Sequence, residues 1–141
     1  MNPLKSQAEQ FEALVQWLRA AIKAPEQFTL SYDAESSEFI RFNKAKVRQA
    51  GQVQQASLSL KLINEGRHAD VTITLGGNPA VDQLRLAQAL KQLRETLPLL
   101  PTDPYLLLNP EPWHSHKVQD QPLPDTAAVL DDIRRAADGV D

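Results

Sequence analysis

The sequence predicts an α+β protein, a two-layer sandwich in which helices cover one face of an antiparallel sheet of four to five strands. Two apolar stripes with helical spacing, one at the N-terminus and one after Gly77, predict the helices. Several segments between them alternate apolar residues with hydroxyl-bearing or charged ones, which is the period of strands with one buried face. A helix stripe and a strand face that are both apolar favour burial against each other.

The first helix is predicted over residues 4–22. Its apolar residues recur at spacings of three and four: Leu4, Ala8, Phe11, Val15, Leu18 and Ile22, with Leu14 and Trp17 widening the stripe. Pro25 then stops the helix, because proline lacks the backbone donor that a helix interior needs.

Three strands follow from period-two alternation, over residues 28–33, 56–62 and 69–75. Their apolar residues are Phe28, Leu30 and Tyr32, then Ala56, Leu58, Leu60 and Leu62, then Ala69, Val71, Ile73 and Leu75. The link Asn-Glu-Gly-Arg at 64–67 predicts a hairpin, since Gly66 can adopt a positive φ. The stretch 37–51 predicts a further hairpin that turns between Asn43 and Lys46, with Ile40 and Phe42 on one face and Phe39 and Arg41 on the other.

The second helix is predicted from Pro79 to Leu97, with Asn78 as its N-cap. Its apolar stripe consists of Val81, Leu84, Ala87, Leu90, Leu93 and Leu97. The glycines Gly76 and Gly77 before this helix could hold an anion on backbone amides. They match neither GxxxxGK[ST] nor GxGxxG, so we favour a tight turn with a cap.

The predicted domains are an α+β domain over 1–97, a Pro-rich connector over 98–124 and a helix over 125–141 that leads toward a missing downstream domain. Seven of the ten prolines lie in the connector. Its apolar residues predict that it packs along a surface: Tyr105, Leu106, Leu107, Leu108 and Trp113. The last helix has Asp125 or Thr126 near its cap and Gly139 as C′ residue, with Val129, Leu130, Ile133 and Ala137 on one side.

Composition narrows the functional classes. The chain has 141 residues, 42% hydrophobic and 23% charged, with a net charge of −3, which is typical of a folded protein. The absence of cysteine excludes a disulfide framework, a thiolate zinc site and a cysteine nucleophile. No apolar run approaches the length of a membrane span, and we expect a cytoplasmic protein that does not act at a membrane.

No catalytic residue is predicted. His114 and His116 could place two imidazoles on one side of an extended segment, but no third ligand lies nearby, so two surface histidines in a loop are the favoured interpretation. His68, beside Arg67 at a hairpin, is expected to be solvated. There is no GxSxG motif for a serine nucleophile.

Two surfaces are candidates for binding. The stretch from Ser37 to Gly51 carries Arg41, Lys44, Lys46 and Arg48 against Glu38; because these residues fall on both faces and the chain is acidic, we disfavour nucleic acid and favour a solvated rim or a contact to an acidic partner. The polar sheet face carries Thr29, Ser31, Ser57, Ser59, Thr72 and Thr74, which fits either an ordinary exposed face or a docking surface. The candidate contacts to a peptide or partner are Arg41, Asn43, Arg48, Ser57, Ser59 and Thr72.

The stretch SEFIRFNKAKVRQAGQVQQASLSLKLINEGRHA resembles the N-terminal domain of the TldD/PmbA family. The similar pattern is a hairpin with Phe39, Arg41, Phe42, Asn43, Val47 and Gln49, followed by a strand, a glycine turn at Gly66 and another strand. The connector and the ending AADGVD also look like the approach to that family's central strand. Members of the family were once called modulators of DNA gyrase and are understood as peptide-processing metalloproteases.

The resemblance implies that zinc is bound by an HExxxH-type motif in a downstream domain, so neither catalytic nor metal-binding residues are expected in these positions. It implies a non-catalytic scaffold that packs on its own C-terminal domain or a homologous subunit, contributes to a homo- or heterodimer, and lines the channel for a polypeptide substrate. Whether the full-length protein is zinc-bearing or metal-free stays open. The alternative is a stand-alone α+β interaction module that binds a partner through its polar sheet face, and a small metal-dependent hydrolase using His114 and His116 is a third hypothesis.

Overall fold

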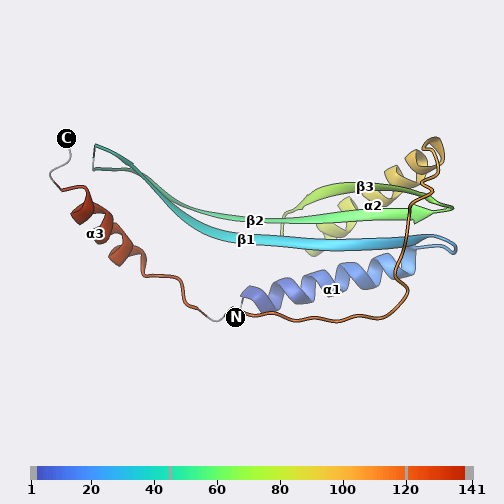
Figure 1. Cartoon of the computed structure of the whole chain (residues 1–141), viewed down its shortest axis with the longest axis horizontal. Helices are drawn as coiled ribbons and strands as arrows, with labels where there is room; N and C mark the ends of the chain where they lie inside the picture. Colours follow the sequence, from blue (N-terminus) through green and yellow to red (C-terminus); the bar gives the residue numbers. More distant parts are fainter. Residues whose placement is uncertain (1–2, 45, 120, 139–141) are drawn as a thin grey trace. The chain divides into compact units, whose positions relative to one another are not determined.

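The computed structural model describes residues 3–44, 46–119 and 121–138. Along the chain the elements are α1 (Pro3–Ala21), β1 (Gln27–Asn43), β2 (Lys46–Asn64), β3 (Arg67–Leu75), α2 (Pro79–Thr96), the short 3-10 helix η1 (Leu97–Leu99) and α3 (Thr126–Ala136). Figure 1 labels all of them except η1. The chain divides into two compact units. We call the first, Met1–Ser36 with Gln54–Leu107, the body, and the second, Ser37–Val53 with Leu108–Asp141, the arm unit.

The sheet of the described chain has three antiparallel strands in the order β1-β2-β3, so the predicted four to five strands were wrong. The segments expected as separate strands are continuous with one another. In β1, residues 33–37 contain no glycine or proline to bend the chain, and pairing with β2 keeps them extended. Gly51 does not interrupt β2 either. The ring of Phe39 packs over it, so closely that a Cβ at this position would meet a ring carbon at 2.9 Å.

The predicted turn at Gly66 is confirmed. The turn predicted between Asn43 and Lys46 agrees with the end of β1 at Asn43 and the start of β2 at Lys46, while Ala45 lies outside the described residues. Between β2 and β3, Glu65 and Gly66 have φ values of 50° and 72°, the left-handed pair that a two-residue hairpin loop requires. This turn sets the register from Asn64 opposite Arg67 to Ala56 opposite Leu75. At the other turn Lys44 has a φ of 48°.

The core of the body lies between the apolar sheet face and the helices α1 and α2, which confirms the two-layer α+β arrangement. Its buried residues are Leu14 and Leu18 from α1, Leu58, Leu60 and Leu62 from β2, Leu75 from β3, and Leu86, Leu90, Leu93 and Leu97 from α2 and the turn after it. Each fully buried leucine contributes about 1.5–3 kcal/mol relative to an exposed one. Apart from Leu75, the predicted apolar residues of β1 and β3 are half-buried and pack against this cluster.

At the start of α2, the residues that face the core are not the predicted Val81 and Leu84. Val81 and Leu84 are 43% and 59% exposed, whereas Asp82 and Leu86 are fully buried. The reason is that Asp82 turns inward to bind the preceding loop, which sets the rotation of the helix. Asn78 does cap α2 as predicted, since its side chain accepts from the backbone N–H groups of Ala80 and Val81.

The first part of the connector is bonded to the β2–β3 hairpin. The backbone N–H of Asp103 donates to the carbonyl of Gly66 at 2.7 Å, and Arg67 Nε donates to the carbonyl of Leu100 at 2.8 Å. Of the apolar connector residues that predicted packing, Tyr105 and Leu107 are exposed in the body.

In the arm unit, α3 begins after Asp125, whose carboxylate accepts from the backbone N–H of Ala128 as the predicted cap. The apolar side of α3 is at most half-buried. Trp113 of the connector is exposed. The Leu4 side chain and Gly139 lie outside the described residues. Among the described helices, none combines the length and the apolar character that crossing a membrane requires.

Candidate functional site

The uncovered face of the sheet is the candidate binding surface of the body. Because α1 and α2 both pack on the apolar face, no described helix of the body covers the hydroxyl-bearing side chains of the opposite face. Those of β2 and β3 lie in register, with Ser57 opposite Thr74 and Ser59 opposite Thr72. The hydroxyls of Ser59 and Thr72 share a hydrogen bond of 2.7 Å.

The six candidate contact residues fall into two groups. Ser57, Ser59 and Thr72 lie together on this open face of the body, whereas Arg41, Asn43 and Arg48 belong to the arm unit. The open face offers hydroxyl donors and acceptors from these three residues, and Lys61 lies on the same face opposite Asp70. It is suited to hydrogen bonding with a polar protein surface.

The hairpin of the arm unit, residues 37–53, is ordered by contacts between its strands; we call it the arm. The guanidinium of Arg41 lies 5.6 Å from the ring centroid of Phe39, which confirms that the two residues share a face. Arg41 also donates to the side chain of Gln49 at 3.4 Å, and Gln52 donates to Glu38. The carboxylate of Glu38 accepts in addition from the hydroxyl of Thr126, and these hydrogen bonds lower the pKa of Glu38.

The glycine turn before α2 is occupied by a carboxylate of the chain itself. The backbone N–H groups of Gly76 and Gly77 donate to the two oxygens of Asp82 at 2.8 and 2.9 Å. Gln10 from α1 donates to the same carboxylate at 2.9 Å, and Arg85 lies 3.7 Å away. The prediction of a tight turn with a cap therefore agrees with the structure, and Asp82 takes the place that an external anion would need.

Sequence reasoning missed Asp82, although one clue was present. The side chain is fully buried, but its position within the stripe of α2 was hidden by the apolar residues beside it, Val81 and Leu84. An acid in the first turn of a helix that follows two glycines is placed to accept from their amides. Burial and, to a smaller extent, this carboxylate raise the pKa of the nearby Tyr32 hydroxyl.

His68 was expected to be solvated, but its side chain pairs with Asp103. Its Nε2 lies 3.0 Å from Oδ2 of Asp103, and both side chains are about one-third exposed. The other oxygen of Asp103 accepts from the backbone N–H of Tyr105 at 2.8 Å. Hydrogen bonds from Tyr105 and from His68 lower the pKa of Asp103, so the histidine serves to hold the connector against the hairpin.

The histidines of the connector, His114 and His116, are both exposed. Within the part of the chain that the structure describes, no group of three or more histidine, aspartate or glutamate side chains is arranged to hold a metal ion.

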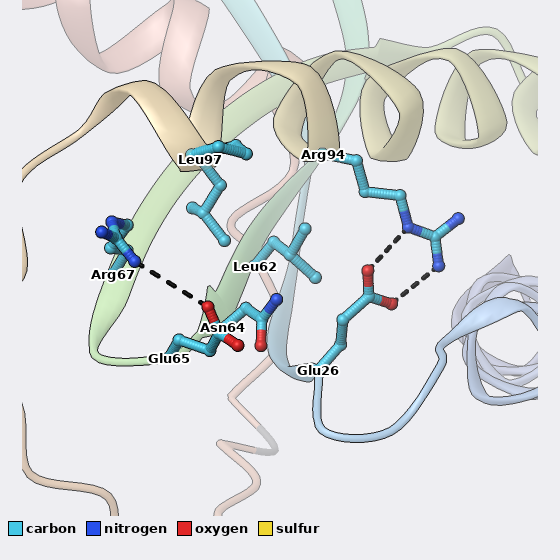
Figure 2. A pocket seen from close by; sticks show the side chains of 8 residues that line it. Glu26, Leu62, Asn64, Glu65, Arg67, Arg94 and Leu97 are labelled. Carbon is cyan, nitrogen blue, oxygen red and sulfur yellow. Dashed lines mark hydrogen bonds and ion pairs between the residues drawn. The ribbon is translucent and has the colours of Figure 1, made fainter.

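A hollow of about 150 Å³ lies where the end of β2, the segment before β1 and the end of α2 meet (Figure 2). Arg94 donates to both oxygens of Glu26, at 2.8 and 2.7 Å, and to the carbonyl of Ala21. The bond to Arg94 lowers the pKa of Glu26, and the same bond raises that of Arg94. Arg94 and Glu26 neutralise each other, and their contacts join the end of α1, the segment before β1 and α2, so the hollow offers little to a charged ligand. Among the described side chains, the buried Oδ1 of Asn64 has no hydrogen-bond partner.

Comparison of the chain with protein-family models, with curated proteins and with solved structures gave no match. The similarity to the TldD/PmbA family therefore stays a prediction that rests on the residues given above.

Proposed function

We propose that this chain is a non-catalytic, polypeptide-binding scaffold, the N-terminal domain of a TldD/PmbA-like peptidase or of its metal-free partner subunit. The observation that carries the proposal is the uncovered sheet face of the body, with Ser57, Ser59 and Thr72 side by side. A sheet buried on one face only is a ready surface for a second domain or subunit.

The chemistry of this face supports protein as the partner. Hydroxyl groups can both donate and accept, so they can pair with backbone and side-chain groups of another polypeptide. Lys61 and Asp70, opposite each other on the same face, add one charge of each sign. In the proposed assembly the partner is the peptidase's own C-terminal domain or a homologous subunit, and zinc is bound there. The scaffold helps to position the polypeptide substrate.

Site-specific photo-crosslinking tests this proposal. A photoreactive residue at Thr72, which is exposed on the open face, is compared in producing cells with one at Leu84, which is exposed on α2. We expect a crosslink from position 72 to a metallopeptidase domain or to a homologous subunit, and none from position 84. Equal crosslinking from both positions, or none from position 72, would contradict the proposal.

The alternative of a stand-alone interaction module rests on the same face and is separated from the leading proposal by mass. Intact mass spectrometry of the protein immunoprecipitated from its own cells gives the length of the natural chain. A mass well above that of the 141 residues is expected for a peptidase scaffold. A mass equal to these residues favours the stand-alone module.

A further inference from the structure

Among the residues that the structure describes, no strand pairs with the β3 side of β2 along the arm, and we call this side its free edge. β3 pairs with β2 only from Ala56 to Asn64, whereas β2 begins at Lys46. On the β3 side, residues 46–53 therefore lie beyond the last partner of β3. Every residue of this segment is exposed except Gly51, which is half-buried beneath the ring of Phe39.

A free edge of this kind presents unpaired backbone donors and acceptors to an extended chain. A two-stranded ribbon is also marginally stable without a third strand or a covering helix. The arm is nevertheless prearranged, because Phe39 packs over Gly51 and Arg41 reaches Gln49 across the ribbon. An added strand would thus meet an ordered template, and less conformational entropy is lost on binding.

The charge of the arm indicates whether a second copy of the chain or an acidic polypeptide pairs with this edge. The arm carries four cationic side chains, those of Arg41, Lys44, Lys46 and Arg48, against the one carboxylate of Glu38. The edge segment 46–53 itself has two cationic residues and no acidic one. Two copies of the chain would bring two cationic arms together, which disfavours pairing of the arm with itself.

The spacing defines the partner further. Lys46 and Arg48 are two positions apart in a strand, so they project from the same face. Acidic side chains two positions apart on an added strand would lie opposite them on that face, where cross-strand pairs of opposite charge are favourable. We propose that residues 46–53 of β2 bind an extended polypeptide segment with alternating acidic side chains by strand addition.

This inference rests on the proposed role as a polypeptide-binding scaffold, but it concerns the edge of the arm and not the open face of the body. Its failure would leave the crosslinking result from Thr72 unchanged. Failure of that crosslink would equally leave peptide binding at the arm untouched.

The probe is the octapeptide acetyl-(Glu-Thr)4-amide, compared with acetyl-(Lys-Thr)4-amide and with the same acidic peptide N-methylated at every residue. Binding is measured by fluorescence anisotropy and located by hydrogen exchange. We expect the acidic peptide to slow exchange in residues 46–53, with an affinity that falls as salt is added. The N-methylated peptide should not bind, because it lacks the backbone donors of a paired strand.

Charge-reversal variants supply the matched controls. Lys46→Glu with Arg48→Glu should weaken binding of the acidic peptide by about tenfold or more. Arg19→Glu with Lys91→Glu, two exposed positions on α1 and α2, makes the same change in net charge and should leave the affinity within about twofold.

Several results would overturn the inference. One is binding of the N-methylated or the lysine peptide with the same affinity as the acidic peptide. Another is that the acidic peptide does not slow hydrogen exchange in residues 46–53, or slows it along the outer edge of β1 instead. Displacement of the peptide by an octanucleotide of single-stranded DNA with equal affinity would show that the arm binds charge alone. Protection of 46–53 without peptide, together with dimer formation in sedimentation, would show that a second copy occupies the edge.

Discussion

Replacement of Asp82 by asparagine tests the most specific tertiary contact of the body. The carboxylate accepts from the backbone N–H groups of Gly76 and Gly77 and from the side chain of Gln10. It thereby joins α1, the link after β3 and the first turn of α2. Asparagine has nearly the same shape, so Asp82→Asn changes hydrogen bonding with little change in packing.

The expected loss follows from the count of acceptors. The amide keeps one oxygen, which can serve at most the two donors that share Oδ2, those of Gly77 and Gln10, and its NH2 group then faces the N–H of Gly76. A hydrogen bond to a charged group contributes about 1.5–3 kcal/mol, and loss of at least one such bond predicts a destabilisation of about 2–3 kcal/mol. Asp82→Ala, which leaves all three donors without their acceptor, should cost about 3–4 kcal/mol, since water can reach the exposed glycines.

Urea unfolding followed by far-UV circular dichroism measures the effect. With a slope of about 1–3 kcal/mol/M, the midpoint of Asp82→Asn should fall by about 0.7–3 M while the slope stays unchanged. Asp33→Asn is the matched control, because Asp33 is exposed on β1, and it should change stability by less than about 0.5 kcal/mol. Equal midpoints for the two asparagine variants would refute the role assigned to Asp82.

A double-mutant cycle separates the contact to α1 from the rest. Gln10→Ala should cost less in the Asp82→Ala background than in the wild type, with a coupling energy of about 0.5–3 kcal/mol. Additive effects would mean that the side chain of Gln10 does not depend on the carboxylate.

Three further predictions concern the fold. Leu60→Asp buries an unpaired charge in the core and should unfold the body, whereas Ser59→Asp on the open face should be tolerated; urea midpoints compare them, and equal losses would contradict the assignment of the two faces. Because Arg94 lowers the pKa of Glu26 in the folded state, the stability that this group contributes is fully present above its unfolded pKa of about 4.3 and is lost as pH falls through the lower folded value. The difference in unfolding free energy between wild type and Glu26→Gln should therefore narrow between pH 6 and pH 2, and a constant difference would refute the pairing. Gly66→Ala should cost about 1 kcal/mol in thermal or urea unfolding, because alanine at a φ of 72° is strained, and a neutral result would contradict this turn geometry.

Local patterns in the chain determine much of the body. The spacing of Leu14 and Leu18, the alternation through Leu58 and Leu60, and the Asn78-Pro79 cap each depend on neighbours in the sequence, and each is confirmed. Helix and strand periods and cap chemistry are set by backbone geometry within a few residues. The choice of an α+β class followed from them.

The number of strands could not be obtained in the same way. Polar residues at 33–37 resemble a turn in composition, and only pairing along the whole length of β1 and β2 keeps this segment extended. Strand continuity depends on a partner distant in the sequence, which local propensity does not contain. The same holds for the free edge at 46–53, which exists because β3 stops at Leu75, opposite Ala56.

By itself the sequence determined the α+β class, the apolar and hydroxyl-bearing faces of the sheet and the caps of α2 and α3, because these follow from the chemistry of adjacent residues. Only the tertiary structure decided that Asp82 turns inward, that His68 pairs with Asp103 and that Arg94 pairs with Glu26. The positions of these polar side chains depend on donors or acceptors in other parts of the fold. For Asp82 these include the glycine turn that precedes α2. A polar residue within an apolar stripe shows its role only when its partner is in place.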